Sequence, residues 1–168
     1  MEDDPADAEF TRPPVTADLV EICRWLNVRQ VNYIVIGGMA VNIHGYTRNT
    51  DDIDLLVDAT ASNEKKVLEA LALLPEGAAK ELQPGDIAKY VVVRVCDEVT
   101  VDLMAKACGH DYAAARKFVT EIEIDGVTIP FASPILLWKT KQTYREKDAM
   151  DRVFLRKLLE DRGEWPVQ

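Results

Sequence analysis

The sequence predicts a mixed α+β domain in which a small mixed β-sheet is flanked by helices. Short β-rich runs alternate with amphipathic helical segments along the chain, which is the pattern of such a domain. A Gly-Gly pair at residues 37–38 and an Asp-Gly pair at residues 125–126 follow two of these runs and indicate tight turns. The 168 residues suit one domain, and the 48% of hydrophobic residues can supply its core.

Two parts are expected along the chain. Residues 1–15 are acidic and contain prolines but few large apolar side chains, so we expect a flexible acidic N-terminal segment. Residues 16–168 are expected to form a single domain, which includes C-terminal helices within residues 133–160.

The elements of the first half follow from the spacing of its apolar residues. Thr16 is the expected N-cap of a helix whose apolar positions recur at i, i+3, i+4 and i+7. Residues 33–36 form a short apolar run that predicts a buried strand, and Gly45 closes a short helix predicted at residues 39–44. Further on we expect a strand at residues 53–57, a helix at residues 62–74 and mainly loop at residues 75–88.

Two antiparallel hairpins are predicted in the second half. The first joins residues 89–96 to residues 99–104 across the polar pair at residues 97–98. The second has the Asp-Gly pair at its turn, which is typical of a type I′ turn, and its strands are expected at residues 119–124 and 127–130.

Helices are expected between and after these hairpins. A short one is predicted around residues 112–117. Ser133 is a typical N-cap, and Pro134 suits the first helical position of a helix over residues 135–145. A last helix is predicted at about residues 148–159.

The charge balance limits the classes of partner. The formal net charge is −9 and the isoelectric point about 4.7, whereas proteins that bind nucleic acid through phosphates usually carry a basic surface. This balance disfavours broad nucleic-acid binding, so tRNA is allowed as a partner but is not favoured. It leaves room for a local basic patch, a divalent cation or a cationic substrate.

The cysteines and the hydropathy pattern exclude further classes. Cys23, Cys96 and Cys108 do not describe a disulfide framework, and no second half of a zinc site accompanies the Cys-Gly-His sequence at residues 108–110. No run approaches the roughly 18–20 apolar residues that span a membrane. The acidic N-terminus lacks the features of a secretory signal, so we expect a cytoplasmic protein without a membrane partner.

The segment with the clearest chemical pattern carries paired aspartates. Asp52 and Asp54 are two residues apart on a predicted strand, so their side chains point to the same face. Asp102 lies within another predicted strand, where aspartate is unfavourable by propensity. Two or three carboxylates that lie close together repel each other unless a cation separates them, and such oxygen ligands suit Mg²⁺ or Mn²⁺.

The Gly-Gly pair precedes these aspartates and follows a strand. A glycine turn that opens a helix lets backbone N–H groups approach phosphate oxygens. The hydrophobic run, Gly37-Gly38, a gap of thirteen residues, Asp-Ile-Asp and a later strand aspartate together resemble the signature of the DNA polymerase β-like nucleotidyltransferases.

The resemblance extends to the minimal bacterial nucleotidyltransferases. This group includes relatives of toxin–antitoxin and abortive-infection proteins and the antibiotic-adenylylating enzymes. The C-terminal stretch LLWKTKQTYREKDAMDRVFL is also similar to that group. The similar pieces lie between residues 32 and 159, and they imply a polymerase β-like nucleotidyltransferase fold with C-terminal helices.

The resemblance also implies roles for individual residues. Asp52 and Asp54 would bind both metal ions, Mg²⁺ or Mn²⁺, and Asp102 would complete the second metal site. Gly37 and Gly38 would approach the triphosphate of a nucleoside triphosphate (NTP), the donor substrate.

Other candidates surround this set. Arg48 is a candidate phosphate contact, and either Lys141 or Lys139 matches the C-terminal lysine of the group, although both also fit a solvated helix face. The sequence does not decide between the two lysines. Further candidates for substrate contact or support are His44, Thr50, Asp148 and Asp151.

Two functions stay open. The first is an enzyme that transfers a nucleoside monophosphate from an NTP to a hydroxyl group of a small molecule, a protein or tRNA. The second is a non-catalytic or weakly catalytic component that binds a cognate partner protein in a toxin–antitoxin or abortive-infection pair. The presence of all three aspartates favours the enzyme, and a homodimer is compatible with either function.

Overall fold

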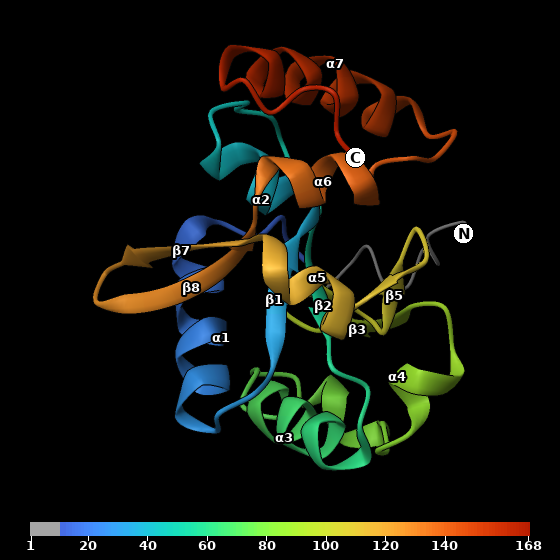
Figure 1. The fold of residues 1–168 in the computed structure, drawn as a ribbon. Helices are drawn as coiled ribbons and strands as arrows, with labels where there is room; N and C mark the ends of the chain where they lie inside the picture. The colour runs from blue at the N-terminus through green and yellow to red at the C-terminus, as the bar shows by residue number, and fades with distance from the viewer. Residues whose placement is uncertain (1–10) are drawn as a thin grey trace.

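The computed structural model describes residues 11–168, so most of the N-terminal segment expected to be flexible lies outside the described residues. Helices and strands alternate along the chain (Figure 1). The helices are α1 (Thr16–Val28), α2 (Gly37–Ile43), α3 (Ala61–Leu71), α4 (Asp86–Lys89), α5 (Tyr112–Ala115), α6 (Pro134–Thr140) and α7 (Glu146–Asp161), with 3-10 turns η2 (Ala78–Glu81) and η3 (Arg116–Phe118). The strands are β1 (Tyr33–Ile36), β2 (Asp52–Val57), β3 (Val93–Cys96), β4 (Thr100–Met104), β5 (Lys106–Ala107), β6 (His110–Asp111), β7 (Val119–Ile124) and β8 (Val127–Ala132).

A six-stranded mixed sheet organises the domain, in the order β3-β4-β2-β1-β8-β7. Strand β2 is antiparallel to β1 and parallel to β4, while β1 is also parallel to β8. The antiparallel hairpins β3–β4 and β7–β8 form the two edges of the sheet. The prediction of a small mixed sheet flanked by helices is therefore confirmed.

The centre of the sheet is buried on both sides. All four residues of β1 are buried, which explains why the sequence there is continuously apolar instead of alternating. On β2, Ile53 and Leu55 are completely buried in the core, whereas Asp52 and Asp54 alternate with them and face the other side.

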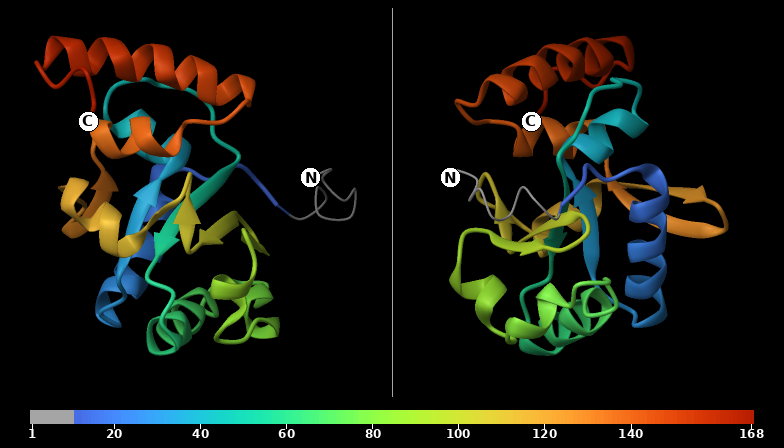
Figure 2. Two further views of the ribbon diagram at one scale, coloured as in Figure 1. Left: turned by 45° about the vertical axis from the view of Figure 1, so that its right-hand side comes forward. Right: turned by 180° about the vertical axis from the view of Figure 1, so that it is seen from behind.

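Helices α2, α6 and α7 lie at one end of the sheet, α3 lies at the other end, and α1 runs alongside the strands (Figure 1). Helix α2 packs on β1 and β2, α6 packs on α2, and α7 packs on α6, which makes the stack at the top of Figure 1. Helix α1 contacts β8 and α3, and α3 lies at the opposite end from α7. The hairpin β7–β8 projects from the body of the domain beside α1 (Figure 2).

Two turn predictions in the second half are confirmed. Asp125 and Gly126 have φ angles of 51° and 79°, the two positive values that a type I′ turn requires. The Ser133 hydroxyl accepts a hydrogen bond from the Leu136 amide, and Pro134 occupies the first turn of α6.

The start of the first helix differs from the prediction. Val15 is the N-cap of α1, and Thr16 is the first helical residue. The Asp18 carboxylate accepts a hydrogen bond of 2.7 Å from the Val15 amide. An acidic side chain that reaches back in this way satisfies the cap without a hydroxyl group.

The predicted strand at residues 89–96 is shorter in the structure. Lys89 ends α4, and β3 begins only at Val93, which pairs with Leu103. The partner strand β4 ends at Met104, which this register places opposite residue 92, so Val91 and the residues before it run past the end of their partner. Val91 is accordingly 87% exposed.

The predicted helix at residues 135–145 ends at Thr140. The Thr140 hydroxyl donates back to the Leu137 carbonyl, and Lys141 is the C-cap. The carbonyls of Lys141 and Thr143 accept hydrogen bonds from the Arg152 guanidinium of α7. The carbonyls of Trp138 and Thr140, which a further helical turn would use, accept instead from the side chains of Gln142 and Cys108, so the chain continues as a loop.

Within residues 11–168, none of the helices combines the length and apolar character that crossing a bilayer requires.

Candidate active site

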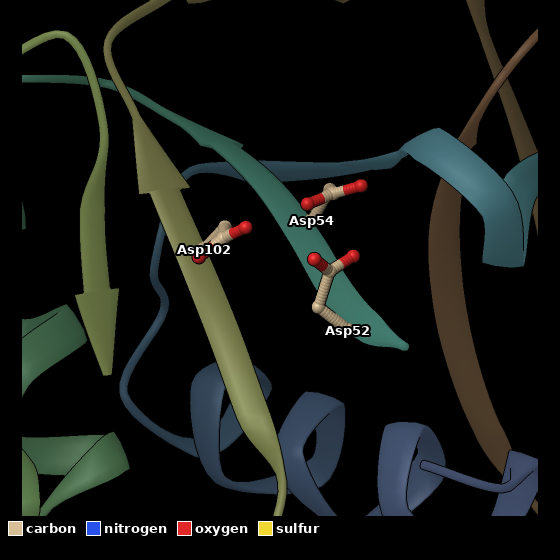
Figure 3. A group of neighbouring side chains, drawn as sticks. All are labelled: Asp52, Asp54 and Asp102. Atoms are coloured by element: carbon tan, nitrogen blue, oxygen red, sulfur yellow. The ribbon is translucent and has the colours of Figure 1, made fainter. Parts of the chain in front are cut away.

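Three aspartates converge on two neighbouring parallel strands. Asp52 and Asp54 lie on β2, and Asp102 of β4 is the direct pairing partner of Asp54. Figure 3 shows their carboxyl groups gathered over these strands. One oxygen atom from each carboxyl group lies within 4.8 Å of the other two. The structure therefore brings together the three carboxylates that the sequence singled out.

Burial and mutual repulsion act on these carboxyl groups. Burial, together with the charges of Asp52 and Asp102, raises the pKa of Asp54 to about 8. Burial and then the charge of Asp102 also raise the pKa of Asp52. Positive charge bound among the carboxylates would oppose both effects and favour their ionised forms.

The two glycines make room for this arrangement. Gly37 has a φ angle of +70°, and a Cβ atom at this position would lie 2.0 Å from Oδ2 of Asp54. A Cβ atom on Gly38 would lie 2.7 Å from Oγ1 of Thr50, whose hydroxyl donates to the Asp52 carbonyl at 3.0 Å. Only residues without a side chain let the start of α2 approach the aspartate-bearing strand so closely.

A polar cleft of about 480 Å³ opens over the three carboxylates. This volume lies in the range typical of small-molecule sites. Its wall carries basic side chains beside the acidic ones: Arg12, Arg48, Arg94, Lys141, Arg145 and Lys147. Such a mixture suits an anionic ligand that arrives together with a cation.

Arg94 is the basic residue in closest contact with the carboxylates. Its Nε atom lies 2.9 Å from Oδ1 of Asp102, and its Nη2 atom lies 3.1 Å from Oδ2 of the same residue. Nη2 also lies 3.6 Å from Oδ2 of Asp52. Arg94 was not among the residues predicted from the sequence, although a single charged residue within an apolar β-rich run was a detectable signal.

Arg48 and Lys141 share a carboxylate at the base of the cleft. Arg48 donates to both oxygens of Asp151, at 2.8 and 2.7 Å, and Lys141 Nζ lies 3.0 Å from Oδ2. Asp151 is completely buried, and Lys141 is 7% exposed. Burial alone would raise the pKa of Asp151, but the hydrogen bonds from Arg48 and Lys141 lower it. This cluster fixes the loop before β2 to the two C-terminal helices.

Asp148 supports the same lysine. Lys141 Nζ lies 3.2 Å from Oδ1 of Asp148, and the Thr143 hydroxyl donates to the other oxygen. Lys141 and Asp148 both line the cleft, so this loop forms part of its wall. Asp51, on the rim, forms an ion pair of 3.2 Å with Lys147.

Two predicted candidates lie elsewhere. Lys139 Nζ lies 4.4 Å from the centre of the Phe118 ring and is not among the residues that line the cleft. We therefore keep Lys141 as the candidate phosphate contact. His44 Nε2 donates to the Ala132 carbonyl at 2.8 Å, and burial lowers the pKa of its imidazole. His44 thus fixes α2 to the end of β8 and does not face the carboxylates.

The first residues that the structure describes border the cleft. Residues 11–13 line it, and the Arg12 amide donates to the Glu98 carbonyl at 3.0 Å. The Arg12 guanidinium also pairs with Asp18 at 2.7 Å. The packing of these residues gave no sequence signal, because their partners are distant in the chain.

The donor set fits a divalent cation of the magnesium type. Three carboxylates offer oxygen ligands from one side of a polar cleft, and hard cations prefer such ligands. The raised pKa of Asp54 is the expected property of a ligand whose charge is not balanced in the metal-free protein.

Solved structures of nucleotidyltransferases share this fold. The lincosamide antibiotic adenylyltransferase LnuA, solved with lincomycin bound, superposes with a TM-score of 0.58 at 17% identity over 88% of this chain and 99% of that one. An antigenic nucleotidyltransferase-like protein from Paracoccidioides brasiliensis gives 0.53 at 18% identity, over 88% of this chain and 79% of the other. The antibiotic-resistance factor ANT(2'')-Ia gives 0.52 at 14% identity, over 86% of each chain.

These similarities establish the fold of the chain. It has the nucleotidyltransferase fold, as the resemblance in the sequence implied. No protein-family profile matches the sequence, and no curated protein sequence matches it either.

Proposed function

We propose that the protein is a metal-dependent nucleotidyltransferase that transfers a nucleoside monophosphate from an NTP to a hydroxyl group, with pyrophosphate leaving. The convergence of Asp52, Asp54 and Asp102 in one cleft is the observation that carries this proposal. The shared fold with solved nucleotidyltransferases supports it. Mg²⁺ or Mn²⁺ held by these carboxylates would neutralise phosphate charge and activate the attacking hydroxyl.

The residues around the carboxylates have separate roles in this proposal. Gly37 and Gly38 keep the start of α2 free of side chains beside Asp54, so that the triphosphate can approach the backbone there. Lys141, oriented by Asp148 and Asp151, supplies a fixed positive charge at the base of the cleft. A preorganised charge of this kind stabilises developing negative charge without reorganisation during the reaction.

Arg48 has a positioning role in this proposal. Its Nε and Nη2 atoms donate to the two oxygens of Asp151, and its Nη1 atom donates to the Asn49 carbonyl. It therefore orients Asp151, which in turn contacts Lys141. Its influence on phosphate is exerted through this lysine.

A small, hydroxyl-bearing and preferably cationic acceptor fits the protein best. The net charge of −9 opposes the binding of tRNA and favours a cationic molecule. The cleft volume of about 480 Å³ accommodates small ligands. Two neighbours in fold are named for antibiotics, the lincosamide adenylyltransferase and the antibiotic-resistance factor, which supports this acceptor class.

Pyrophosphate release tests the proposal. Each NTP is incubated with Mg²⁺ and a panel of hydroxylated amines and matched neutral alcohols. We expect release that depends on the metal, on one or two of the NTPs and on a cationic acceptor, and that is lost in Asp52→Asn/Asp54→Asn. Metal-independent release, or equal release by this double variant, would contradict the assignment of the carboxylates.

A further inference from the structure

We infer that Arg94 is the internal counter-ion of the third carboxylate, Asp102, and competes with a divalent cation for it. Arg94 thereby sets the cation affinity of the nucleotide-free protein. This inference rests on the proposed function, and it adds a positioning residue that belongs to the same site.

The contact occupies both oxygens of Asp102. Nε and Nη2 of Arg94 lie 2.9 and 3.1 Å from Oδ1 and Oδ2, which is the two-point arrangement that a planar guanidinium makes with a carboxylate. Asp102 is 6% exposed, so few alternative partners can reach these oxygens from solvent. While Arg94 stays in place, each oxygen of Asp102 accepts a hydrogen bond from it, so the carboxylate is a weaker ligand for a cation.

The sheet register fixes this contact. Arg94 on β3 is the direct antiparallel partner of Asp102 on β4, and Asp102 is in turn the parallel partner of Asp54 on β2. Directly opposite residues on neighbouring strands have side chains close enough to interact. The same register that assembles the carboxylates therefore also delivers the guanidinium to them.

The guanidinium is placed where a cation would compete with it. Nη2 of Arg94 lies 3.6 Å from Oδ2 of Asp52, so the arginine lies between two of the three carboxylates. A divalent cation bound at the same oxygens would repel this positive charge over a few ångströms. Arg94 and a cation bound at Asp102 therefore weaken each other's interaction with the same carboxylates.

Arg94 lies where an entering ligand can reach it. Its side chain is 32% exposed, and β3 is one of the two edge strands of the sheet. The residue also lines the cleft into which a triphosphate would enter. Phosphate oxygens accept the same two-point hydrogen bonds from arginine as a carboxylate does, so an entering nucleotide offers the guanidinium a new partner.

Manganese affinity without nucleotide tests this inference. Binding of Mn²⁺ alone is measured by calorimetry and by electron paramagnetic resonance for the wild type, Arg94→Gln and Arg94→Lys. We expect Arg94→Gln to bind Mn²⁺ about tenfold more tightly or better, because a positive charge is removed from the ligands. Arg94→Lys is expected to show a smaller increase, since an ammonium ion cannot hold both oxygens of Asp102 in the same way.

Lys147→Gln is the matched control. Lys147 also lines the cleft, but it pairs with Asp51 on the rim, so this variant loses the same charge without touching Asp102. Its Mn²⁺ affinity should change by less than about threefold. If Lys147→Gln raised the Mn²⁺ affinity as much as Arg94→Gln, the gain would come from the loss of any positive charge near the cleft and not from the contact with Asp102. That result would overturn the inference.

The remaining outcomes separate this inference from the proposed function. If wild-type protein binds Mn²⁺ with an NTP but Arg94→Gln shows no gain for Mn²⁺ alone, the role of Arg94 is wrong and the proposed function stands. If neither protein binds Mn²⁺ or a metal–NTP complex, both are wrong. Thermal unfolding of each variant confirms that it is folded before binding is measured.

Discussion

At the scale of single residues, the buried carboxyl group of Asp54 makes the stability of the metal-free protein depend on pH. Burial and two neighbouring carboxylates raise the pKa of Asp54 from its ordinary value of 3.8 to about 8. The folded protein therefore binds more protons than the unfolded chain between these two values. The contribution of this group to stability is complete below pH 4 and is lost as the pH rises through about 8.

Asp54→Asn should therefore stabilise the metal-free protein at neutral pH. Each unit of pKa shift corresponds to about 1.4 kcal/mol, so a gain of about 1 kcal/mol or more in the free energy of unfolding is expected. For a domain of this size that is a rise of about 2–4 °C in Tm. Differential scanning calorimetry between pH 5 and 8 measures it, and the gain should increase with pH.

Added metal should stabilise the wild type but not this variant. Added Mg²⁺ should raise the Tm of the wild type and should leave Asp54→Asn nearly unchanged, because a carboxylate ligand is missing. A variant that is less stable than the wild type at every pH would contradict the assignment of charge repulsion to this site.

Gly37 is the second residue whose local geometry makes a sharp prediction. Gly37→Ala would place a Cβ atom 2.0 Å from Oδ2 of Asp54, so the carboxylate must move. Displacement of a ligand by its immediate surroundings typically lowers metal affinity by about 10- to 100-fold. Calorimetric titration with Mn²⁺ and an NTP measures the loss.

Gly163→Ala is the control for backbone strain. Gly163 has a φ angle of +71°, nearly that of Gly37, but no atom lies within 4 Å of the position of its Cβ. Both variants should lose about 1 kcal/mol of stability from the left-handed backbone. Normal binding by Gly37→Ala, or an equal loss by Gly163→Ala, would show that the close approach to Asp54 is not what matters.

At the scale of elements, the cluster around Asp151 connects the C-terminal helices to the sheet. Asp151→Ala would leave Arg48 without its two-point partner and Lys141 with Asp148 alone. Removal of one partner from a buried ion pair typically destabilises by about 3 kcal/mol. Urea unfolding measures this change.

An exposed ion pair serves as the comparison for this prediction. Arg156 and Glu160 pair at 2.9 Å on the surface of α7, and both side chains are about half exposed. Glu160→Ala should change stability by less than about 0.5 kcal/mol. Equal effects of the two substitutions would mean that α7 is not held by the Asp151 cluster.

Much of the element order could be predicted from the sequence, because its signals are local. The apolar run of β1, the type I′ turn and the Ser133 cap each depend on a few adjacent residues. The spacing of Asp52 and Asp54 likewise determined that they share a face. Their approach to Asp102 was a hypothesis that rested on an aspartate within a second predicted strand and on the resemblance to a known group, because strand order is not a local property.

The register of β3 and β4 shows why the site was predicted incompletely. A two-residue turn at residues 97–98 would have paired Arg94 with Val101, but in the structure Arg94 pairs with Asp102. The buried carboxylate of Asp97 accepts hydrogen bonds from distant amides, including those of Glu76 and Ala78, and this lengthens the turn. The contact that places Arg94 in the site thus depends on a tertiary interaction.

The loop after α6 was also missed in the prediction, because tertiary contacts determine where that helix ends. Helical periodicity extended the predicted helix through Lys141, but the segment after Thr140 is a loop, whose carbonyls at Lys141 and Thr143 are held by Arg152 of α7. As a result Lys141 points into the cleft while Lys139 stacks over Phe118. The choice between the two lysines depended on this contact between the loop and α7, which the sequence does not encode locally.

At the scale of the whole molecule, charge separates the acceptor classes. The net charge of −9 repels a polyanion, and salt weakens any local attraction to phosphates. We expect no retention of tRNA at physiological salt in a gel-shift or filter-binding experiment, even with protein in the micromolar range. Retention that weakens steeply with salt would instead indicate a nucleic-acid acceptor.

The central claim is that three aspartates and a cation form one nucleotide site, and calorimetric titration of each of the four NTPs tests it most directly. The wild type and Asp52→Asn/Asp54→Asn are compared, with and without Mg²⁺ or Mn²⁺. We expect binding of at least one NTP that requires the metal and is absent from the double variant. A folded wild-type protein that binds no NTP with either metal would contradict the claim and would favour a role in binding a partner protein.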